Sequence, residues 1–170
     1  MRGLSELATL AIAVTAVSPA LAEDYASPDH RAAADAVTGF MQAIASDDKT
    51  ELANHMIPEA LIFVLNQMDP ETPRVDVVPV AQHLERWAAR TGDYEEVMSY
   101  DTVLVSGDMA QVWGPYSFRY NGTLTHCGVN SISLVRRDDG VWKVGNTSFS
   151  MVAPDRCDEV GASWVNHDDQ

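Results

Sequence analysis

The sequence contains few cysteines, few basic residues and no long apolar segment. Of its 170 residues, 2 are cysteine, 11 are Lys or Arg and 25 are Asp or Glu, which gives a formal net charge of −14. Such an acidic surface repels phosphate backbones and anionic lipids, so we expect no nucleic-acid partner. The apolar stretch at 7–17 is shorter than the roughly 20 residues of a membrane-spanning helix, and no later segment is long enough. We therefore expect no membrane insertion.

The N-terminal segment has the parts of a secretory signal in order. Arg2 gives a positive start, the apolar stretch at 7–17 follows, and the segment ends in Ala20, Leu21 and Ala22. Small residues at the last and third-last positions match the rule for signal cleavage. We predict a signal peptide over 1–22, cleaved after Ala22, and a periplasmic or secreted mature protein. The alternative interpretation is an ordinary N-terminal helix.

The two cysteines, Cys127 and Cys157, then lie in an oxidising compartment. An even count there favours a disulfide, and closing a loop of about 30 residues would stabilise the fold by ~3 kcal/mol. The alternative is two unrelated buried thiols. Neither cysteine has the C-x-x-C or Cys/His spacing of a redox or metal site, and the histidines are scattered, so we expect no metal and no cofactor.

Apolar residues recur at helical spacing in the first half of the mature chain. Between 29 and 45 they form one stripe, which predicts an amphipathic helix with Ser27 as its N-cap. A short second helix is expected after Ser46, ending before Pro58. A third helix is expected over 79–90, where the spacing returns with Val80, Leu84 and Trp87.

From residue 94 onwards, β-branched and aromatic residues alternate with turn signals. We expect antiparallel strands over about 94–105, 109–120, 124–137 and 141–152, and an irregular acidic tail over 154–170. A short buried strand at 60–65 precedes them. The segment 66–78 is predicted to be a loop that acts as a flap, and Gly114 with Pro115 predicts a bulge. Helices followed by a meander predict an α+β fold, with three N-terminal helices packed on a curved, mainly antiparallel sheet.

Three segments resemble the nuclear transport factor 2-like superfamily, in the region of its lumazine-binding and SnoaL-like branches. They are AQVWGPYSF at 110–118, GTLTHCG at 122–128 and GVWKV at 140–144. The resemblance covers about 32–152 and implies a cone-shaped domain, to which we assign 23–153. It also implies that a homodimer is a common arrangement. Proteins of this fold include isomerases, dehydratases, ligand carriers and adaptors, so the resemblance implies no particular reaction.

The last hairpin can be registered from its turn. If residues 138–140 form a three-residue loop with Gly140 in the left-handed region, Arg136 pairs with Trp142. A two-residue turn would reverse the faces, and we choose the first register because it buries the apolar residues. Three polar residues then share the concave face with Trp142, namely His126, Asn130 and Asn146.

Polar groups on an apolar concave face need partners, which a cavity holding water or ligand supplies. We therefore predict a ligand pocket lined by Phe40, Trp113, Tyr116, His126, Asn130, Trp142 and Asn146. For the aromatic residues the alternative is a core or a dimer interface, and for His126 it is a core histidine bonded to the backbone. The facing of Tyr116 and Phe118 stays open. In a hydrated pocket His126 is expected to titrate near its ordinary value of about 6.5.

These features favour an exported protein that binds a small hydrophobic or amphipathic molecule. An isomerase or dehydratase would need a base and a hydrogen-bond donor in the pocket, for which His126 and Tyr116 are the candidates. The steroid isomerases of the superfamily carry a tyrosine donor on the first helix, where this chain has Phe40 and Met41. We therefore assign no catalytic residue.

A protein-interaction adaptor is the remaining alternative. It would use the outer face of the sheet, where the chosen register places Val129 and Val135. The same face would serve a homodimer.

Overall fold

The computed structural model describes residues 27–162. Its elements in chain order, with 3₁₀ helices labelled η, are α1 (Pro28–Ala45), η2 (Glu51–Asn54), β1 (Leu61–Asn66), β2 (Arg74–Pro79), α2 (Val80–Ala88), β3 (Tyr94–Met98), β4 (Thr102–Ser106), β5 (Met109–Tyr120), β6 (Thr123–Arg136), β7 (Trp142–Met151) and η3 (Pro154–Val160). The predicted signal peptide and its cleavage after Ala22 lie outside these residues. Within 27–162, no helix is long and apolar enough to cross a membrane.

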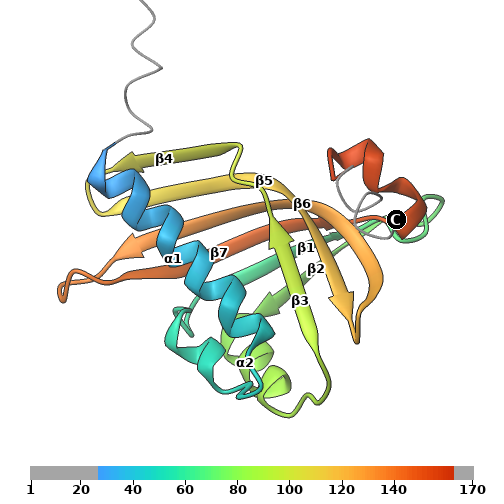
Figure 1. Ribbon diagram of the computed structural model, residues 1–170, viewed down its shortest axis with the longest axis horizontal. Helices are drawn as coiled ribbons and strands as arrows, with labels where there is room; N and C mark the ends of the chain where they lie inside the picture. Colours follow the sequence, from blue (N-terminus) through green and yellow to red (C-terminus); the bar gives the residue numbers. More distant parts are fainter. Residues whose placement is uncertain (1–26, 163–170) are drawn as a thin grey trace, which may run out of the picture.

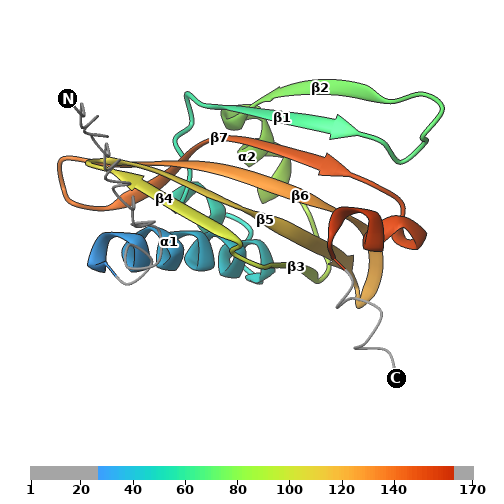
Figure 2. The ribbon, with the colours of Figure 1, turned by 90° about the horizontal axis from the view of Figure 1, so that it is seen from above.

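The strands form one curved sheet in the order β2-β1-β7-β6-β5-β3, and β4 also pairs with β5. Every pairing is antiparallel except that of β1 with β7. Helix α1 lies across one face of this sheet, and the β1–β2 hairpin lies beyond β7 (Figures 1 and 2). The α+β fold with helices packed on a mainly antiparallel sheet is therefore confirmed.

Helix α1 begins and packs as its residues predict. The Ser27 side chain accepts a hydrogen bond from the backbone N–H of His30, and Pro28 occupies the first turn, where a missing N–H costs nothing. The buried face of the helix is the predicted apolar stripe: Ala33, Val37, Phe40, Met41 and Ile44, together with Ala43. This stripe joins the sheet in the main hydrophobic core.

The last hairpin has the predicted register. Gly140 has a φ of 80°, the left-handed value that the three-residue loop requires. Arg136 pairs with Trp142, and the N–H of Arg137 donates to the carbonyl of Val141 at 3.0 Å. Ile132, which lies on the same face, is buried as expected.

One predicted strand, at 94–105, is two separate strands. Both β3 and β4 pair with β5, but opposite Gly114 and Pro115 neither does. The carbonyl of Pro115 points towards β3 and β4 and accepts a hydrogen bond from the N–H of Ser99 at 3.0 Å. Proline has no N–H, so it cannot donate a second hydrogen bond to the same neighbour. The backbone also crosses so close to Gly114 that a Cβ there would lie 1.8 Å from the oxygen of Ser99.

The bulge predicted at Gly114 and Pro115 is therefore wrong, because both residues stay in register with β6. The irregularity falls instead between Phe118 and Arg119, where β6 contains an extra residue, Thr125. The Thr125 hydroxyl donates to the carbonyl of Phe118 at 3.1 Å. The missing proline N–H thus interrupts the neighbouring strand and leaves its own strand continuous.

Strand β7 contains a bulge that the sequence did not predict. Leu134 pairs with Val144 and Ile132 pairs with Thr147, so three steps on β7 match two steps on β6. Because side chains alternate along a strand, one extra residue reverses the two faces beyond it. Thr147 is therefore buried, and Asn146 is exposed.

The segment 66–78 is not a loop throughout, since β2 occupies its second half and pairs with β1 from Leu61↔Pro79 to Asn66↔Arg74. Valines in this segment supply the β propensity that its prolines and acidic residues obscure. Strand β1 is also less buried than predicted, because only Ile62 of its six residues is fully buried. The hairpin projects past the core at the edge of the sheet.

The predicted disulfide between Cys127 and Cys157 is confirmed. It ties β6 to η3, so the tail predicted to be irregular from 154 instead begins with a 3₁₀ helix. Both cysteines are buried in a small second cluster with Val152 and Ala162. The domain limits at 23 and 153 stay a prediction.

Replacing Gly114 by alanine should destabilise the fold by about 3 kcal/mol or more, because the new methyl group would collide with the backbone of Ser99 rather than with a movable side chain. Urea unfolding measures the loss. Gly145→Ala is the matched control, since a Cβ there would meet only the oxygen of Ser133 at 3.5 Å, which is an ordinary contact. Equal stability of the two variants would contradict this account of β3 and β4.

Candidate functional site

A cavity of about 640 Å³ lies between the two α-helices and the concave face of the sheet. Its walls come from α1, β1, β2, α2, β3, β5, β6 and β7, so nearly every element contributes. Much of the wall is apolar, formed by Phe40, Ile44, Met56, Ile62, Val64, Val78, Trp87, Phe118, Ile132, Phe149 and Met151.

A carboxyl group faces this cavity from β3. Strand alternation places Glu96 on the same face as Tyr94 and Met98. One carboxyl oxygen of Glu96 accepts a hydrogen bond from the side-chain amide of the buried Asn130 at 2.7 Å. Burial raises the pKa of Glu96 to about 7, and the hydrogen bond from Asn130 opposes this shift. The carboxyl therefore exchanges a proton near neutral pH.

His126 and Tyr116 line the wall next to this carboxyl. The imidazole stacks on Phe118 with 4.9 Å between ring centroids, and meets Tyr116 edge-on at 5.8 Å. Burial lowers the pKa of His126 to about 4, so the ring is neutral at pH 7 and lacks the hydrated surroundings for which a value near 6.5 is expected. The hydroxyl of Tyr116 donates to the carbonyl of Ser150 at 2.9 Å.

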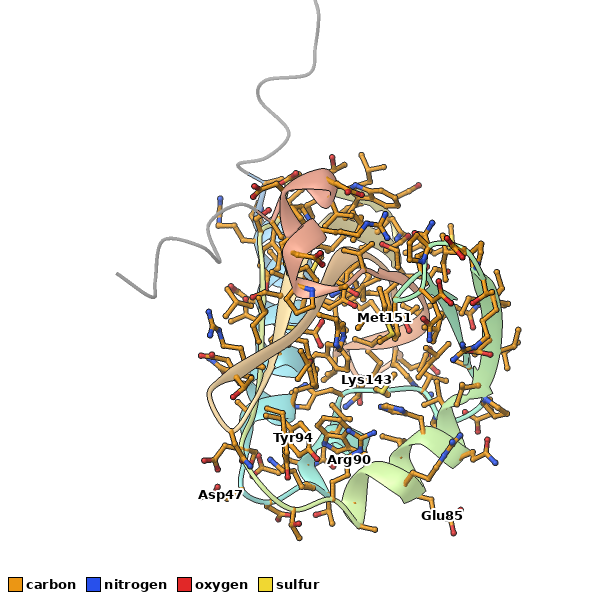
Figure 3. All side chains as sticks on the ribbon, turned by 90° about the vertical axis from the view of Figure 1, so that its right-hand side faces the viewer. Asp47, Glu85, Arg90, Tyr94, Lys143 and Met151 are labelled. Atoms are coloured by element: carbon orange, nitrogen blue, oxygen red, sulfur yellow. A yellow bond between two sulfur atoms is a disulfide. The ribbon has the colours of Figure 1, made fainter. Side chains whose placement is uncertain are left out.

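The end of helix α2 and the residues just after it bring two arginines, Arg86 and Arg90, to the cavity. Arg86 lies on the same side of the helix as His83, because residues three apart are neighbours on a helix. Arg90 follows the helix end at Ala88 and lines the cavity with His83, Arg86 and Trp87. The pKa of His83 is lowered to about 4, mainly by burial and to a smaller extent by the positive charges of Arg90 and Arg86. Figure 3 shows Arg90 beside Tyr94, while Glu85 of α2 points away from them.

The structure brings together four of the seven predicted pocket residues: Phe40, Tyr116, His126 and Asn130 all line the cavity. The other three do not. Trp142 is buried in the core away from the cavity, and Trp113 is 48% exposed on the outer face of the sheet. Strand alternation explains Trp113, since Val112 and Gly114 on either side of it point inwards.

Asn146 is the third predicted residue that misses the cavity, and the bulge in β7 is the reason. Beyond this bulge the outer face carries Asn146, whose side-chain oxygen accepts from the N–H of Leu61 at 2.9 Å. Thr147 and Phe149 take the inner positions instead.

The sequence analysis missed the charged residues of the site. Glu96 follows another glutamate, and such a pair looks solvated. Tyr94 and Met98, two positions away on either side, were the signal that Glu96 lies on the inner face of its strand. Arg86 and Arg90 are exposed residues in and just after α2, which is the usual position of a solvated arginine. Within residues 27–162, no three metal-binding side chains gather closely enough to hold an ion.

Comparison with known proteins supports the fold and leaves the activity open. Neither a model of a known family nor a curated protein matches the chain. Solved structures do match, among them a proposed dehydratase of the nuclear transport factor 2-like family from Streptomyces avermitilis, with 22% identity, a TM-score of 0.57, and coverage of 73% of this chain and 96% of that chain.

Two further structures show the range of similar proteins. A ketosteroid isomerase-like protein from Erwinia carotovora atroseptica has 14% identity and a TM-score of 0.54 over 75% of this chain and 98% of its own. A nuclear transport factor 2-like protein of unknown function from Shewanella baltica has 11% identity and a TM-score of 0.53 over 72% and 93%. The chain therefore has the nuclear transport factor 2-like fold, and its branch stays a prediction.

The raised pKa of Glu96 predicts how stability depends on pH. Between about pH 4.5 and 7 the folded protein keeps this proton while the unfolded chain has lost it, so the free energy of unfolding falls as the pH rises through this window. In Glu96→Gln the fall should be smaller by about 3 kcal/mol. Urea unfolding at pH 4 and pH 8 tests this. Glu95→Gln, on the exposed face of the same strand, is the control and should behave as wild type. If the free energy of unfolding falls as much in Glu96→Gln as in wild type, Glu96 ionises normally.

Proposed function

We propose that this protein binds a small amphipathic molecule in the cavity between its helices and its sheet. The observation that carries the proposal is a space of about 640 Å³ with largely apolar walls and a few polar groups, since small-molecule sites typically measure about 300–1,000 Å³. Apolar side chains that line such a space can contact the apolar body of a small molecule. Glu96 and Asn130 provide a polar end to which one functional group of the ligand can bond.

A second candidate function, proton-transfer catalysis, is supported by Glu96. A general base works best when its pKa is near the working pH, and burial raises the pKa of Glu96 to about 7. Glu96 is better suited to this role than His126, the base considered from the sequence, whose lowered pKa makes it a weak base. Tyr116 is less suited as the donor, because its hydroxyl proton is bonded to Ser150.

We also propose that the mature protein is exported and forms a homodimer. The disulfide supports export, because such bonds persist in oxidising compartments. Exposed apolar side chains on the outer sheet surface and its edge support an interface, among them Leu104, Met109, Trp113 and Val135. Light scattering of the purified protein distinguishes the dimer from a monomer, which would leave this surface to another protein partner.

Filling the cavity with a large side chain should weaken the binding of a small apolar probe. Val64 lines the cavity from β1, so in Val64→Trp the indole should occupy the ligand's space and weaken binding of N-phenyl-1-naphthylamine, a neutral fluorescent probe, by about tenfold or more. Val75→Trp, on the exposed outer face of the same hairpin, is the matched control and should bind as wild type. Equal binding by both variants would place the probe outside the cavity.

Proton transfer can be tested with 5-nitrobenzisoxazole, whose ring opens when a base removes its C3 proton. The protein should accelerate this reaction, and the rate should rise with pH through about 7 as Glu96 becomes a carboxylate. Glu96→Gln should lower the rate by roughly 100-fold, whereas His126→Gln should retain most of it. Loss of the rate in His126→Gln alone would assign the base to the histidine.

A further inference from the structure

We propose that the ligand of this cavity is an organic anion, whose carboxylate or similar oxyanion binds the guanidinium groups of Arg86 and Arg90. This inference rests on the binding function proposed above and adds the charge of the ligand and its orientation. The anionic group would lie at α2, and the apolar body of the ligand would extend between the aromatic side chains of the interior. Three observations support it.

The first observation is the placement of the two arginines. Both line the cavity and both are exposed, so they lie where the cavity opens to solvent. Arg86 lies in the last turn of α2, and Arg90 lies two residues beyond the end of this helix at Ala88. Glu85, the acidic neighbour of Arg86 in sequence, points away from Arg90 (Figure 3). The C-terminal end of α2 and the residues after it therefore bring two positive charges to the cavity, while Glu85 faces away from Arg90.

The second observation is that these arginines lack acidic partners. In the described part of the chain, Arg74, Arg136 and Arg156 form ion pairs with carboxylates. No such pair involves Arg86 or Arg90, although Asp and Glu outnumber Lys and Arg by 25 to 11. An acidic protein that leaves two arginines unpaired at its cavity has guanidinium groups available for an external oxyanion.

Neutral contacts hold the two guanidinium groups in place. Arg86 donates to the side-chain oxygen of Gln82 at 2.7 Å. The guanidinium of Arg90 lies 4.9 Å from the ring of Trp87 and 5.4 Å from that of Tyr94. Stacking on aromatic rings fixes the position of the charge but uses few of its N–H donors. Both side chains are therefore oriented without being neutralised.

The third observation is the distribution of the other charges on the cavity wall. Asp76 is paired with Arg74 at 3.0 Å, so its charge is compensated. Glu96 reaches the wall from β3, where its carboxyl group accepts a hydrogen bond from Asn130 of β6 at 2.7 Å. The carboxylate form of Glu96 would repel an anion, whereas Arg86 and Arg90 attract one. These charges allow one orientation of an anionic ligand, with its charged end at α2.

Two fluorescent probes with the same ring system test this proposal. N-phenyl-1-naphthylamine is neutral, and 1-anilinonaphthalene-8-sulfonate adds a single sulfonate group. In the double variant Arg86→Gln/Arg90→Gln, the Kd of the sulfonate probe should rise about tenfold or more, while that of the neutral probe should change less than about twofold. Added salt should weaken binding of the sulfonate probe to wild type and leave the neutral probe unaffected.

The control is Arg119→Gln/Arg137→Gln, which removes the same charge from two arginines that do not line the cavity. It should leave both Kd values unchanged, and an equal loss of sulfonate binding would reduce the effect to net charge and overturn the proposal. Equal affinities of wild type and Arg86→Gln/Arg90→Gln for the sulfonate probe would also overturn the proposal of an anionic ligand. In that case the proposed binding function would still stand if Val64→Trp weakens binding of the neutral probe. Failure of wild type to bind either probe would refute both proposals.

Discussion

The fold depends on one missing hydrogen-bond donor, the backbone N–H of Pro115. Without it the strand next to β5 cannot continue past this point, and the close approach of the chain at Gly114 leaves room only for a hydrogen side chain. The neighbouring strand therefore divides into β4, which packs near α1, and β3, which carries Tyr94 and Glu96 along the cavity. The position of the carboxyl group thus follows from the position of the proline.

Much of the fold follows from local sequence patterns. The apolar stripe between 29 and 45, the turn at Gly140 and the pair of cysteines each predict one feature, and each is confirmed. The bulge in β7 was not predictable in the same way, because one extra residue in a strand has no distinctive composition. That single residue moved Asn146 from the predicted pocket to the outer surface.

The candidate site was harder to predict than the fold because its charged members look like surface residues. The two adjacent glutamates in β3 and the arginines in and just after α2 have the pattern of solvated residues, because charged side chains usually lie at the surface. Only the curvature of the sheet and the angle of α2 turn these residues towards each other. His126 and Asn130 were found because the hairpin turn fixes their register, whereas no turn of known type fixes β3.

The disulfide lies in a cluster of its own, separate from the main core. Cys127, Cys157, Val152 and Ala162 pack together at the end of β6, whereas the helices pack against the rest of the sheet. A cluster with its own contacts can open without the remainder, as a local unfolding unit. Reduction would therefore release η3 while the cavity keeps its walls, and amide exchange confined to η3 would show it. The covalent bond fastens the C-terminal end of the fold to β6, whereas the main core holds the walls of the binding site.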